Sequence, residues 1–293
     1  MKIVIIGAGG RLGAALHREY ALEHEIQGFN HSQLDLASAD AISALLEPLD
    51  FDLLINGAAL TNVDYCETHP EEAMQINAVA VHRIAVIAAR KKARVIHIST
   101  DYVFDGDKHT PYLEADPAYP ISVYGVSKKQ GESELLAVSD SNLVVRVSWV
   151  FGPERPSFID QILKRALETE DVSAIADKTS APAYTLDIAR HLKPLLFQQP
   201  VGGILHLCNS GECTWHQYGQ FAIDCAIASG LPIKGKKVAP LAMADLKAFI
   251  ARRPVYTVLS TDRLADLTGE TPRDWRLAVE EYVRLVGTTF LAS

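Results

Sequence analysis

Tyr124 and Lys128 are the residues whose types and spacing best suit proton-transfer chemistry in this sequence. Residues four apart on a helix share one face, so the phenol and the ammonium would lie side by side. A nearby positive charge favours ionisation of a phenol, whose ordinary pKa of about 10 is too high for proton transfer at neutral pH. Tyrosine and lysine are also common surface residues, so the interpretation depends on the elements that position this pair.

The composition is that of a chain that can bury a large core, with 293 residues, 48% of them hydrophobic and 22% charged. The net charge is −8 and the longest basic run is residues 90–92, which argues against a nucleic-acid surface. No apolar run reaches the roughly 18 residues of a membrane span. The apolar run at 3–6 is also too short for a signal peptide. The four cysteines lack disulfide or metal spacing, so we expect reduced thiols in a cytoplasmic protein.

A glycine-rich turn follows the first β-branched run, residues 2–6, and precedes a helix-forming segment at 14–23. Gly7, Gly10 and Gly13 would let the backbone turn tightly, let a diphosphate approach and let the helix pack on the strand. The helix N-terminus would offer free N–H groups to the anion. The order of strand, glycine turn and helix favours dinucleotide binding over a merely tight turn.

The second expected strand, residues 25–29, bears on the choice of cofactor. Dinucleotide sites usually place an acid near the end of this strand to hold the ribose hydroxyl, but Asn30 stands there. With Arg11 in the glycine turn, the site could accept a 2′-phosphate. NADP(H) is therefore favoured and NAD(H) remains open, since Arg11 could equally be a solvated surface charge.

A helix at 40–49 and a third strand at 51–56 are expected next, with Ala58 and Ala59 at the carboxyl end of the strand. Open α/β sheets bind ligands at this edge, and small side chains admit a flat cofactor. A long helix over 70–92 carries apolar residues at helical spacing. Asn77 lies within that apolar stripe, either as a satisfied core amide or as an organiser of hydrogen bonds at the active site.

The fourth expected strand, residues 94–99, ends at Thr100 and Asp101, whose side chains could serve as caps or turn formers. A loop with three prolines then leads to the helix that begins near Tyr124. Another buried strand is expected at 143–147. Trp149 follows it at the ligand edge, although a tryptophan is more often part of the core.

Beyond residue 156 the pattern becomes less regular. Helices are expected at 158–169, 185–197, 214–229 and 277–286, with strands at 172–175 and 204–207. We predict an α/β fold, a Rossmann-type doubly wound parallel sheet with a smaller C-terminal substrate-binding lobe. Residues 1–152 would form the NAD(P)-binding domain. Residues 153–293 would partly complete its sheet and partly form the lobe.

Three ordered motifs carry a resemblance to a known superfamily. They are the glycine turn, Ser99-Thr100-Asp101-Tyr102-Val103-Phe104 and Tyr124-Gly-Val-Ser-Lys128. Together they resemble the extended short-chain dehydrogenase/reductases. The stretches 56–64 and 146–149, with Trp275, look most like the dTDP-4-dehydrorhamnose reductase family, and the likeness covers nearly the full length.

The resemblance assigns roles to particular residues. Thr100, Tyr124 and Lys128 would be catalytic, and Thr100, Asp101 and Trp149 would lie against the sugar. Cofactor contacts would come from the glycine turn and from the ends of the second and third strands: Gly7, Gly10, Arg11, Leu12, Gly13, Asn30, Asp35, Leu36, Ala58, Ala59, Leu60 and Thr61, with Tyr124 and Lys128. Ala15 stands where some members have a metal-binding glutamate, so no metal is expected.

The implied reaction is NAD(P)H-dependent reduction of the 4-keto group of a nucleotide-linked deoxysugar, dTDP-4-dehydro-L-rhamnose giving dTDP-L-rhamnose. Tyr124 would donate a proton to the sugar oxygen, Thr100 would hydrogen-bond it, and Lys128 would tune Tyr124 and hold the nicotinamide ribose. The alternatives are a sugar-nucleotide epimerase or dehydratase, or a non-catalytic NADP-binding regulatory subunit. A nucleotide-linked sugar is the expected partner, nucleic acid and membrane are not, and a homodimer is compatible with the sequence.

Overall fold

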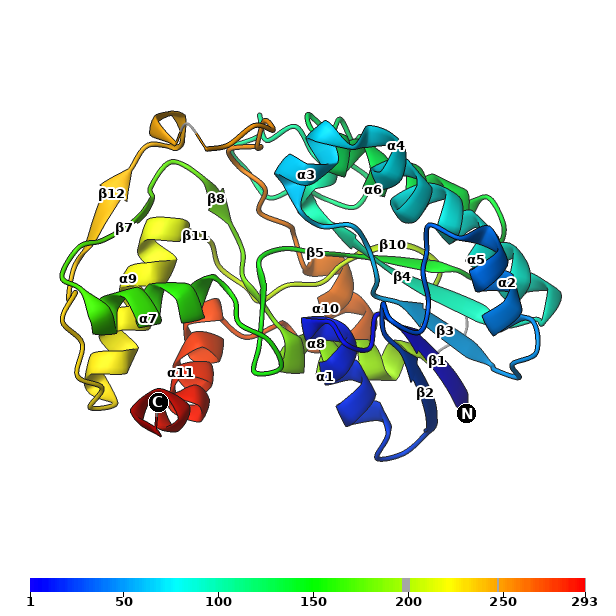
Figure 1. Cartoon of the computed structure of the whole chain (residues 1–293), viewed down its shortest axis with the longest axis horizontal. Helices are drawn as coiled ribbons and strands as arrows, with labels where there is room; N and C mark the ends of the chain where they lie inside the picture. Colours follow the sequence, from blue (N-terminus) through cyan, green and yellow to red (C-terminus); the bar gives the residue numbers. More distant parts are fainter. Residues whose placement is uncertain (197–200, 247, 293) are drawn as a thin grey trace.

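A six-stranded parallel sheet forms the centre of the computed structural model, which describes residues 1–196, 201–246 and 248–292 (Figure 1). Its strand order is β10-β5-β4-β3-β1-β2, and every neighbouring pair is parallel. The strands are β1 (Lys2–Ile6), β2 (Glu25–Phe29), β3 (Leu53–Asn56), β4 (Arg94–Thr100), β5 (Leu143–Val147) and β10 (Gly203–His206). The central strands are short and almost wholly buried, as expected of a sheet covered on both faces.

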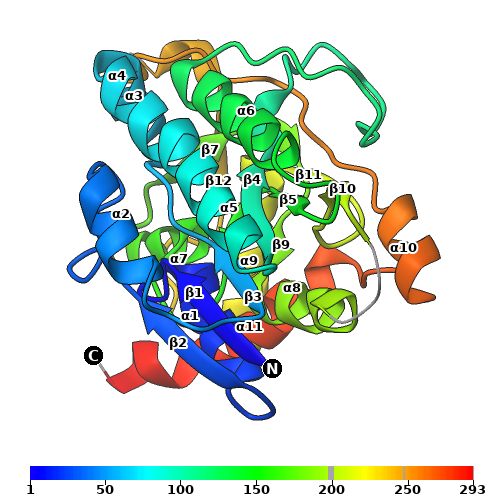
Figure 2. The same cartoon turned by 90° about the vertical axis from the view of Figure 1, so that its right-hand side faces the viewer.

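Helices cover both faces of this sheet, because alternate side chains of β1 point to opposite faces and both sets are apolar. Ile3 and Ile5 pack in the core shared with α1 (Arg11–Tyr20) and α8 (Thr185–Leu192), while Val4 and Ile6 pack in the core of the other face. That other face is covered by α2 (Ala39–Leu46), α5 (Ala80–Arg90) and α6 (Val123–Leu136). Figure 2 shows α5 and α6 side by side in front of β4. The doubly wound fold predicted from the sequence is confirmed.

The long helix expected at 70–92 is divided by one turn of π-helix. Its parts are α4 (Pro70–Met74), the π-turn Gln75–Val79 and α5, preceded by the short helix α3 (Val63–Thr68), which the sequence did not indicate. A π-turn accommodates one extra residue in a helix and frequently marks a functional site. Asn77 lies within this turn, fully buried.

A smaller lobe lies beside the sheet, on the left in Figure 1. Its core is formed by α7 (Phe158–Glu168), α9 (Trp215–Ala228) and α11 (Trp275–Ala292), with the parallel strands β7 (Val172–Ile175) and β12 (Val238–Leu241). Two-residue strand pairs connect the lobe to the rest: β6 (Val150–Phe151) with β9 (Ala183–Tyr184), and β8 (Thr179–Ser180) with β11 (Cys213–Thr214). A further helix, α10 (Asp262–Thr268), also lay outside the sequence prediction.

The helix expected at 185–197 ends earlier, at Leu192, and continues as a 3₁₀ turn over Lys193–Leu196; Phe197 lies outside the described residues. The remaining shorter turns are 3₁₀ helices at Asp101–Val103 and Met243–Asp245. No helix in the described part of the chain is long and apolar enough to cross a membrane.

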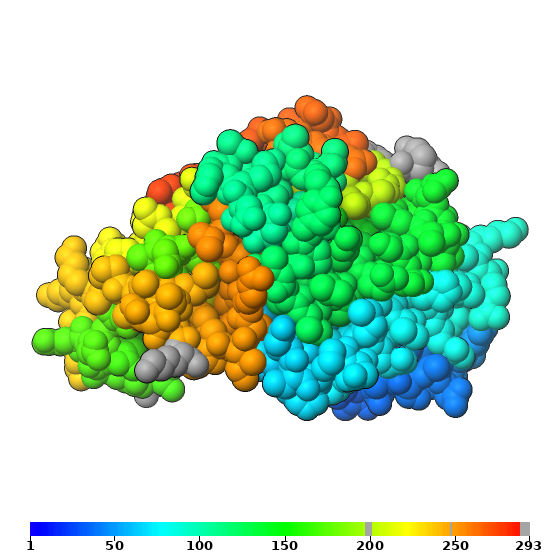
Figure 3. Space-filling view, turned by 90° about the horizontal axis from the view of Figure 1, so that it is seen from above, coloured from blue at the N-terminus to red at the C-terminus, as the bar shows by residue number. Residues whose placement is uncertain are grey.

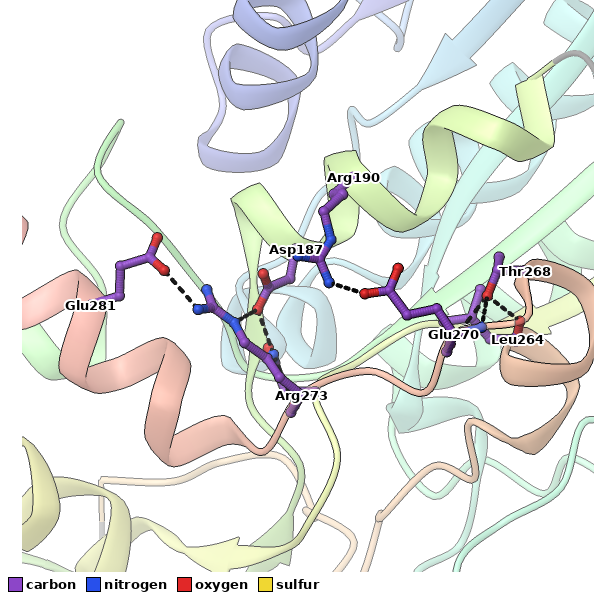
Figure 4. A network of polar contacts seen from close by, with 8 residues as sticks. Asp187, Arg190, Leu264, Thr268, Glu270, Arg273 and Glu281 are labelled. Atoms are coloured by element: carbon purple, nitrogen blue, oxygen red, sulfur yellow. Dashed lines mark hydrogen bonds and ion pairs between the residues drawn. The ribbon is translucent and has the colours of Figure 1, made fainter.

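Charged side chains join α8, beneath the sheet, to the lobe (Figure 4). The guanidinium of Arg273 donates to Asp187 Oδ2 at 2.8 Å and to Glu281 Oε2 at 2.6 Å. Asp187 also accepts from Asn209 Nδ2 at 2.6 Å. These contacts come from α8, α11, the segment before α11 and the segment after β10, so they fix how the lobe meets the helix layer.

Candidate active site

A cavity of about 1190 Å³ opens at the carboxyl ends of β1, β3 and β4. This is the edge where the strand order reverses around β1, and open α/β sheets bind ligands there. Every site residue predicted from the sequence lines this cavity except Gly13: Gly7, Gly10, Arg11, Leu12, Asn30, Asp35, Leu36, Ala58, Ala59, Leu60, Thr61, Thr100, Asp101, Tyr124, Lys128 and Trp149.

The glycine turn has the geometry that a diphosphate requires. Gly7 has φ +84°, and a Cβ on Gly13 would lie 2.1 Å from the Gly7 carbonyl oxygen, so neither position admits a side chain. Gly10 is the N-cap of α1 and offers no side-chain cap. The first N–H groups of α1 lack intrahelical partners and are available to an anion. The residues therefore fit the diphosphate of a dinucleotide cofactor.

Arg11 is placed differently from the expectation that it would face a 2′-phosphate. Its guanidinium donates to the backbone carbonyls of Val150 and Arg155, both at 3.1 Å, and to that of Pro156. Burial lowers the pKa of Arg11. The sequence argument that its side chain favours NADP(H) is therefore wrong, because the side chain is occupied in holding the segment after β5.

Thr100 and Tyr124 come from different elements and meet at the cavity. Thr100 ends β4, and its hydroxyl donates to Asp101 Oδ1 at 3.1 Å and accepts from the Tyr102 amide at 3.2 Å. Tyr124 lies in the first turn of α6, which Ser122 caps by accepting from the Gly125 amide at 3.2 Å. The rings of Tyr102 and Tyr124 pack edge to face, 5.6 Å between centroids, which orients the Tyr124 phenol.

Burial raises the pKa of Tyr124 above its ordinary value, and a hydrogen bond from Thr100 opposes this rise. The next electrostatic influences come from Asp101 and Cys66, not from Lys128. The expectation that Lys128 lowers the pKa of Tyr124 stays a prediction. Tyr124 is thus a protonated phenol at neutral pH, which suits a proton donor.

Lys128 is buried and turned towards the sheet. Its Nζ lies 3.1 Å from Nε2 of His97 and donates to the Ile98 carbonyl at 2.7 Å. Burial lowers the pKa of Lys128 to about 8, and the nearby Glu132 opposes this shift. His97 is itself fully buried and bonded to Asn56, so β3 and β4 together position Lys128.

The π-turn fixes another side of the cavity through Asn77. Its Oδ1 accepts from the Leu60 amide at 2.8 Å, and its Nδ2 donates to the Leu60 carbonyl at 3.0 Å and to Ser127 Oγ at 3.0 Å. Asn77 is therefore a satisfied buried amide that also links the loop after β3 to α6. The two roles left open by the sequence are combined in one residue.

The Asp101 carboxylate lies in a cluster of buried hydroxyls. Oδ2 accepts from Thr257 Oγ1 at 2.6 Å and Ser148 Oγ at 3.1 Å, and Ser180 Oγ lies 3.4 Å away. Ser148 directly follows β5, Ser180 belongs to β8, and Thr257 lies in the segment after β12. Asp101 thus holds three distant segments together while it lines the cavity.

Trp149 lies at the lobe side of the cavity in a strained backbone conformation. Its φ is +41°, which is rare for a bulky residue and costs on the order of 1–3 kcal/mol. Its ring packs near Trp215 and Tyr218, with centroid distances of 5.6 and 6.1 Å. Such strain persists where the surroundings fix it, and it clusters at ligand sites.

The sequence did not indicate His97 or Arg155 among the residues of the site. For His97, only its position three residues before Thr100 on the same strand hints at its contact with Lys128. Arg155 lines the cavity from the segment after β6, far along the chain from the glycine turn. No group of three or more His, Cys, Asp or Glu in the described residues could hold a metal ion.

The doubly wound sheet, its glycine turn and the group formed by Thr100, Tyr124 and Lys128 define a nucleotide-dependent enzyme of the short-chain dehydrogenase/reductase class. The chain belongs to the RmlD family, whose model, RmlD substrate binding domain, matches residues 1–287.

Known proteins resemble the chain along nearly its whole length. A dTDP-4-dehydrorhamnose reductase of Burkholderia thailandensis is 32% identical, with 97% of this chain and 98% of the relative covered. The crystal structure of the Clostridium acetobutylicum dTDP-4-dehydrorhamnose reductase superposes with a TM-score of 0.90 at 28% identity, covering 98% and 99%. A Bacillus anthracis dTDP-4-dehydrorhamnose reductase in complex with NADP gives a TM-score of 0.87 at 28% identity, covering 96% and 98%.

Proposed function

We propose that the chain reduces the 4-keto group of a nucleotide-linked deoxysugar with NADPH, and that dTDP-4-dehydro-L-rhamnose is its substrate, giving dTDP-L-rhamnose. The observation that carries this proposal is the convergence of Thr100, Tyr124 and Lys128 on one cavity with the glycine turn. The activity named for the Burkholderia relative and the NADP bound to the Bacillus anthracis enzyme support it.

The cavity has room for two ligands. Pockets for a single small ligand usually measure about 300–1,000 Å³. At about 1190 Å³, this cavity is larger, and it extends from the glycine turn past Tyr124 to Trp149. A dinucleotide at the glycine turn and a sugar nucleotide at the Trp149 end would place the keto carbon between them.

Each catalytic side chain then has a distinct task. NADPH, when bound, supplies the hydride. The Tyr124 phenol gives its proton to the carbonyl oxygen as that oxygen gains negative charge, and its raised pKa keeps the proton in place until then. When the substrate binds, the Thr100 hydroxyl turns its single proton from Asp101 Oδ1 to the same carbonyl oxygen, and Lys128 holds the ribose hydroxyls beside Tyr124.

The two parts of the chain divide these tasks. Residues 1–152 bind the cofactor, and residues 153–293 contribute both to the sheet and to the lobe that binds the sugar nucleotide. The reaction takes place in the cytoplasm, in keeping with four free thiols, of which Cys66, Cys208 and Cys213 are buried.

A panel of dTDP-, GDP- and UDP-linked 4-keto-6-deoxysugars, each mixed with NADPH and followed by absorbance, tests the proposal. We expect stoichiometric NADPH consumption with the dTDP sugar and much slower consumption with the others. The matched control is Tyr124→Phe, which keeps the ring and should lower turnover by about 10²- to 10⁴-fold while NADPH still binds.

Other outcomes would overturn the proposal in distinguishable ways. Conversion of a keto sugar without net NADPH consumption would identify an epimerase or dehydratase, because those reactions return the cofactor unchanged. NADPH binding without reduction of any sugar in the panel would identify a regulatory subunit. Unchanged turnover in Tyr124→Phe would remove the assigned proton donor.

A further inference from the structure

The corner of the cavity formed by Gly9 and Asn30 lies where β1 and β2 end. A Cβ placed on Gly9 would lie 3.0 Å from Cβ of Asn30, so the two residues are in close contact across this corner. In doubly wound dinucleotide folds the adenosine ribose lies at the end of the second strand. The Asn30 side chain is neutral, and its Oδ1 accepts from the amide and hydroxyl of Ser32 at 2.9 and 2.7 Å.

The segment carrying Arg155, residues 150–156, is held against α1 beside this corner. Figure 1 shows the chain passing beside α1 on its way from β5 to α7. Arg11 donates to three carbonyls of this segment, and Arg18 forms an ion pair with Glu154, Nη1 to Oε1 2.5 Å. The segment is therefore tied to α1 at both of its ends.

The Arg155 side chain reaches the Gly9 corner and has no protein partner there. Its Nη2 lies 3.8 Å from a Cβ placed on Gly9. The side chain is exposed, and within the described residues its guanidinium makes no hydrogen bond or ion pair. Nearby Arg11 is also positive, so the local field attracts an anion. A guanidinium with all its donors available is well suited to a phosphate, which it can bind through two parallel hydrogen bonds.

We propose that Arg155 binds the 2′-phosphate of NADP(H), and that Arg11 serves as the positioning residue that holds the Arg155 segment over the ribose. This inference rests on the proposed function, since it assigns one end of the same cofactor site. In this proposal the preference for NADP(H) comes from Arg155, in the segment after β6, and not from a residue of the glycine turn. The preference would then depend on contact between residues 1–152 and residues 153–293.

The experiment compares two probes that differ only in the phosphate under study, adenosine 2′,5′-bisphosphate and 5′-AMP. Calorimetric titration of the full chain should show that the wild type binds the bisphosphate more tightly. Arg155→Ala should weaken the bisphosphate by about tenfold to a hundredfold and leave 5′-AMP unchanged, because one charge-assisted contact is lost. Arg155→Lys should recover part of the loss, since an ammonium provides charge without the planar pair of donors.

Arg165→Ala is the matched control, because Arg165 is an exposed arginine of α7 outside the cavity and its loss changes the net charge equally. The control should bind both probes as the wild type does, and thermal unfolding should be the same for both alanine variants. Equal affinity of the wild type for the two probes, or an Arg155→Ala variant that keeps the wild-type preference, overturns the proposal. The titrations need no sugar, so they test the role of Arg155 even if the reductase assay shows no activity.

Discussion

Nζ of Lys128 lies 3.1 Å from Nε2 of His97 inside the protein. The other ring nitrogen of His97 faces Nδ2 of Asn56 at 3.1 Å, while Oδ1 of Asn56 accepts from the Ala58 amide at 3.2 Å. Burial and the neighbouring charge of Lys128 lower the pKa of His97, so its imidazole is neutral. Burial likewise lowers the pKa of Lys128 to about 8.

The pH dependence of turnover should show this lowered pKa. We expect kcat/KM for sugar reduction to fall above about pH 8, because Lys128 then loses the proton with which, in the proposed mechanism, it would hold the ribose. Tyr124 does not produce this limb, because burial raises its pKa. In Lys128→Arg the side chain keeps its positive charge, so the fall of kcat/KM should begin at a higher pH. A fall at the same pH as in the wild type would show that Lys128 is not the group that titrates.

Lys128 should also weaken the fold at neutral pH. Its pKa is about 8 when folded against an ordinary 10.5, so the folded chain must bury an ammonium below about pH 8. This penalty disappears as the pH rises from about 8 to 10.5. Lys128→Met should therefore raise the free energy of unfolding by about 1–3 kcal/mol at pH 7 and by less at pH 10, measured by urea unfolding.

The matched control is the adjacent, less buried Lys129, whose change to Met should leave stability nearly unaltered. A Lys128→Met variant that is less stable than the wild type at pH 7 would show that the bond to the Ile98 carbonyl outweighs burial of the charge.

A buried ion pair behind the site should be sensitive to loss of one partner. Arg146 donates to Glu132 through Nε at 2.8 Å and Nη2 at 2.6 Å, and both side chains are at least 96% buried. Glu132→Leu would leave the guanidinium without its carboxylate and should cost about 3–5 kcal/mol of unfolding free energy. The double variant Glu132→Leu, Arg146→Met should cost less than the single one. Additive costs in a double-mutant cycle would contradict this coupling.

Gly13→Ala should disable the cofactor site. The added Cβ would meet the Gly7 carbonyl oxygen at 2.1 Å, and because the obstacle is backbone, the glycine turn must move. We expect loss of NADPH affinity by more than tenfold in a fluorescence titration. Gly219→Ala in α9 is the control, since its Cβ would make ordinary contacts with Ile162 at 3.5 Å and Phe158 at 3.6 Å and should leave binding unchanged. Wild-type NADPH affinity in Gly13→Ala would show that the glycine turn accepts a Cβ at position 13 without losing the cofactor site.

The sequence predicted the sheet well because its central strands are continuous apolar runs, as at Leu143–Val147, and such runs give a strong signal. It did not predict α3, which has six residues with a single buried one, Cys66. The π-turn was also missed, because inserting one residue hardly disturbs an apolar stripe at 70–92.

The candidate site was predicted in the same uneven way. Residues near the glycine turn and around Tyr124 were found through spacing within one segment. The partners of Arg11 lie about 140 positions along the chain, and Lys128 meets His97 across 31 positions. Contacts of this kind depend on tertiary packing, which local patterns do not encode, so the partners of Arg11 and the contact between Lys128 and His97 could not be predicted from the sequence.

The edge strand β10 pairs with β5 although more than fifty residues, including those of α7 and β7 in the lobe, separate them along the chain (Figure 1). Figure 3 shows the lobe residues near 240 at the left of the molecule and the N-terminal residues, blue and cyan, at the right. During synthesis, β5 leaves the ribosome well before β10 and waits with an open hydrogen-bonding edge, which is a template for pairing with other chains. Translation that stops near residue 160 would therefore release a fragment inclined to aggregate, whereas a chain extended past residue 206 can close that edge itself.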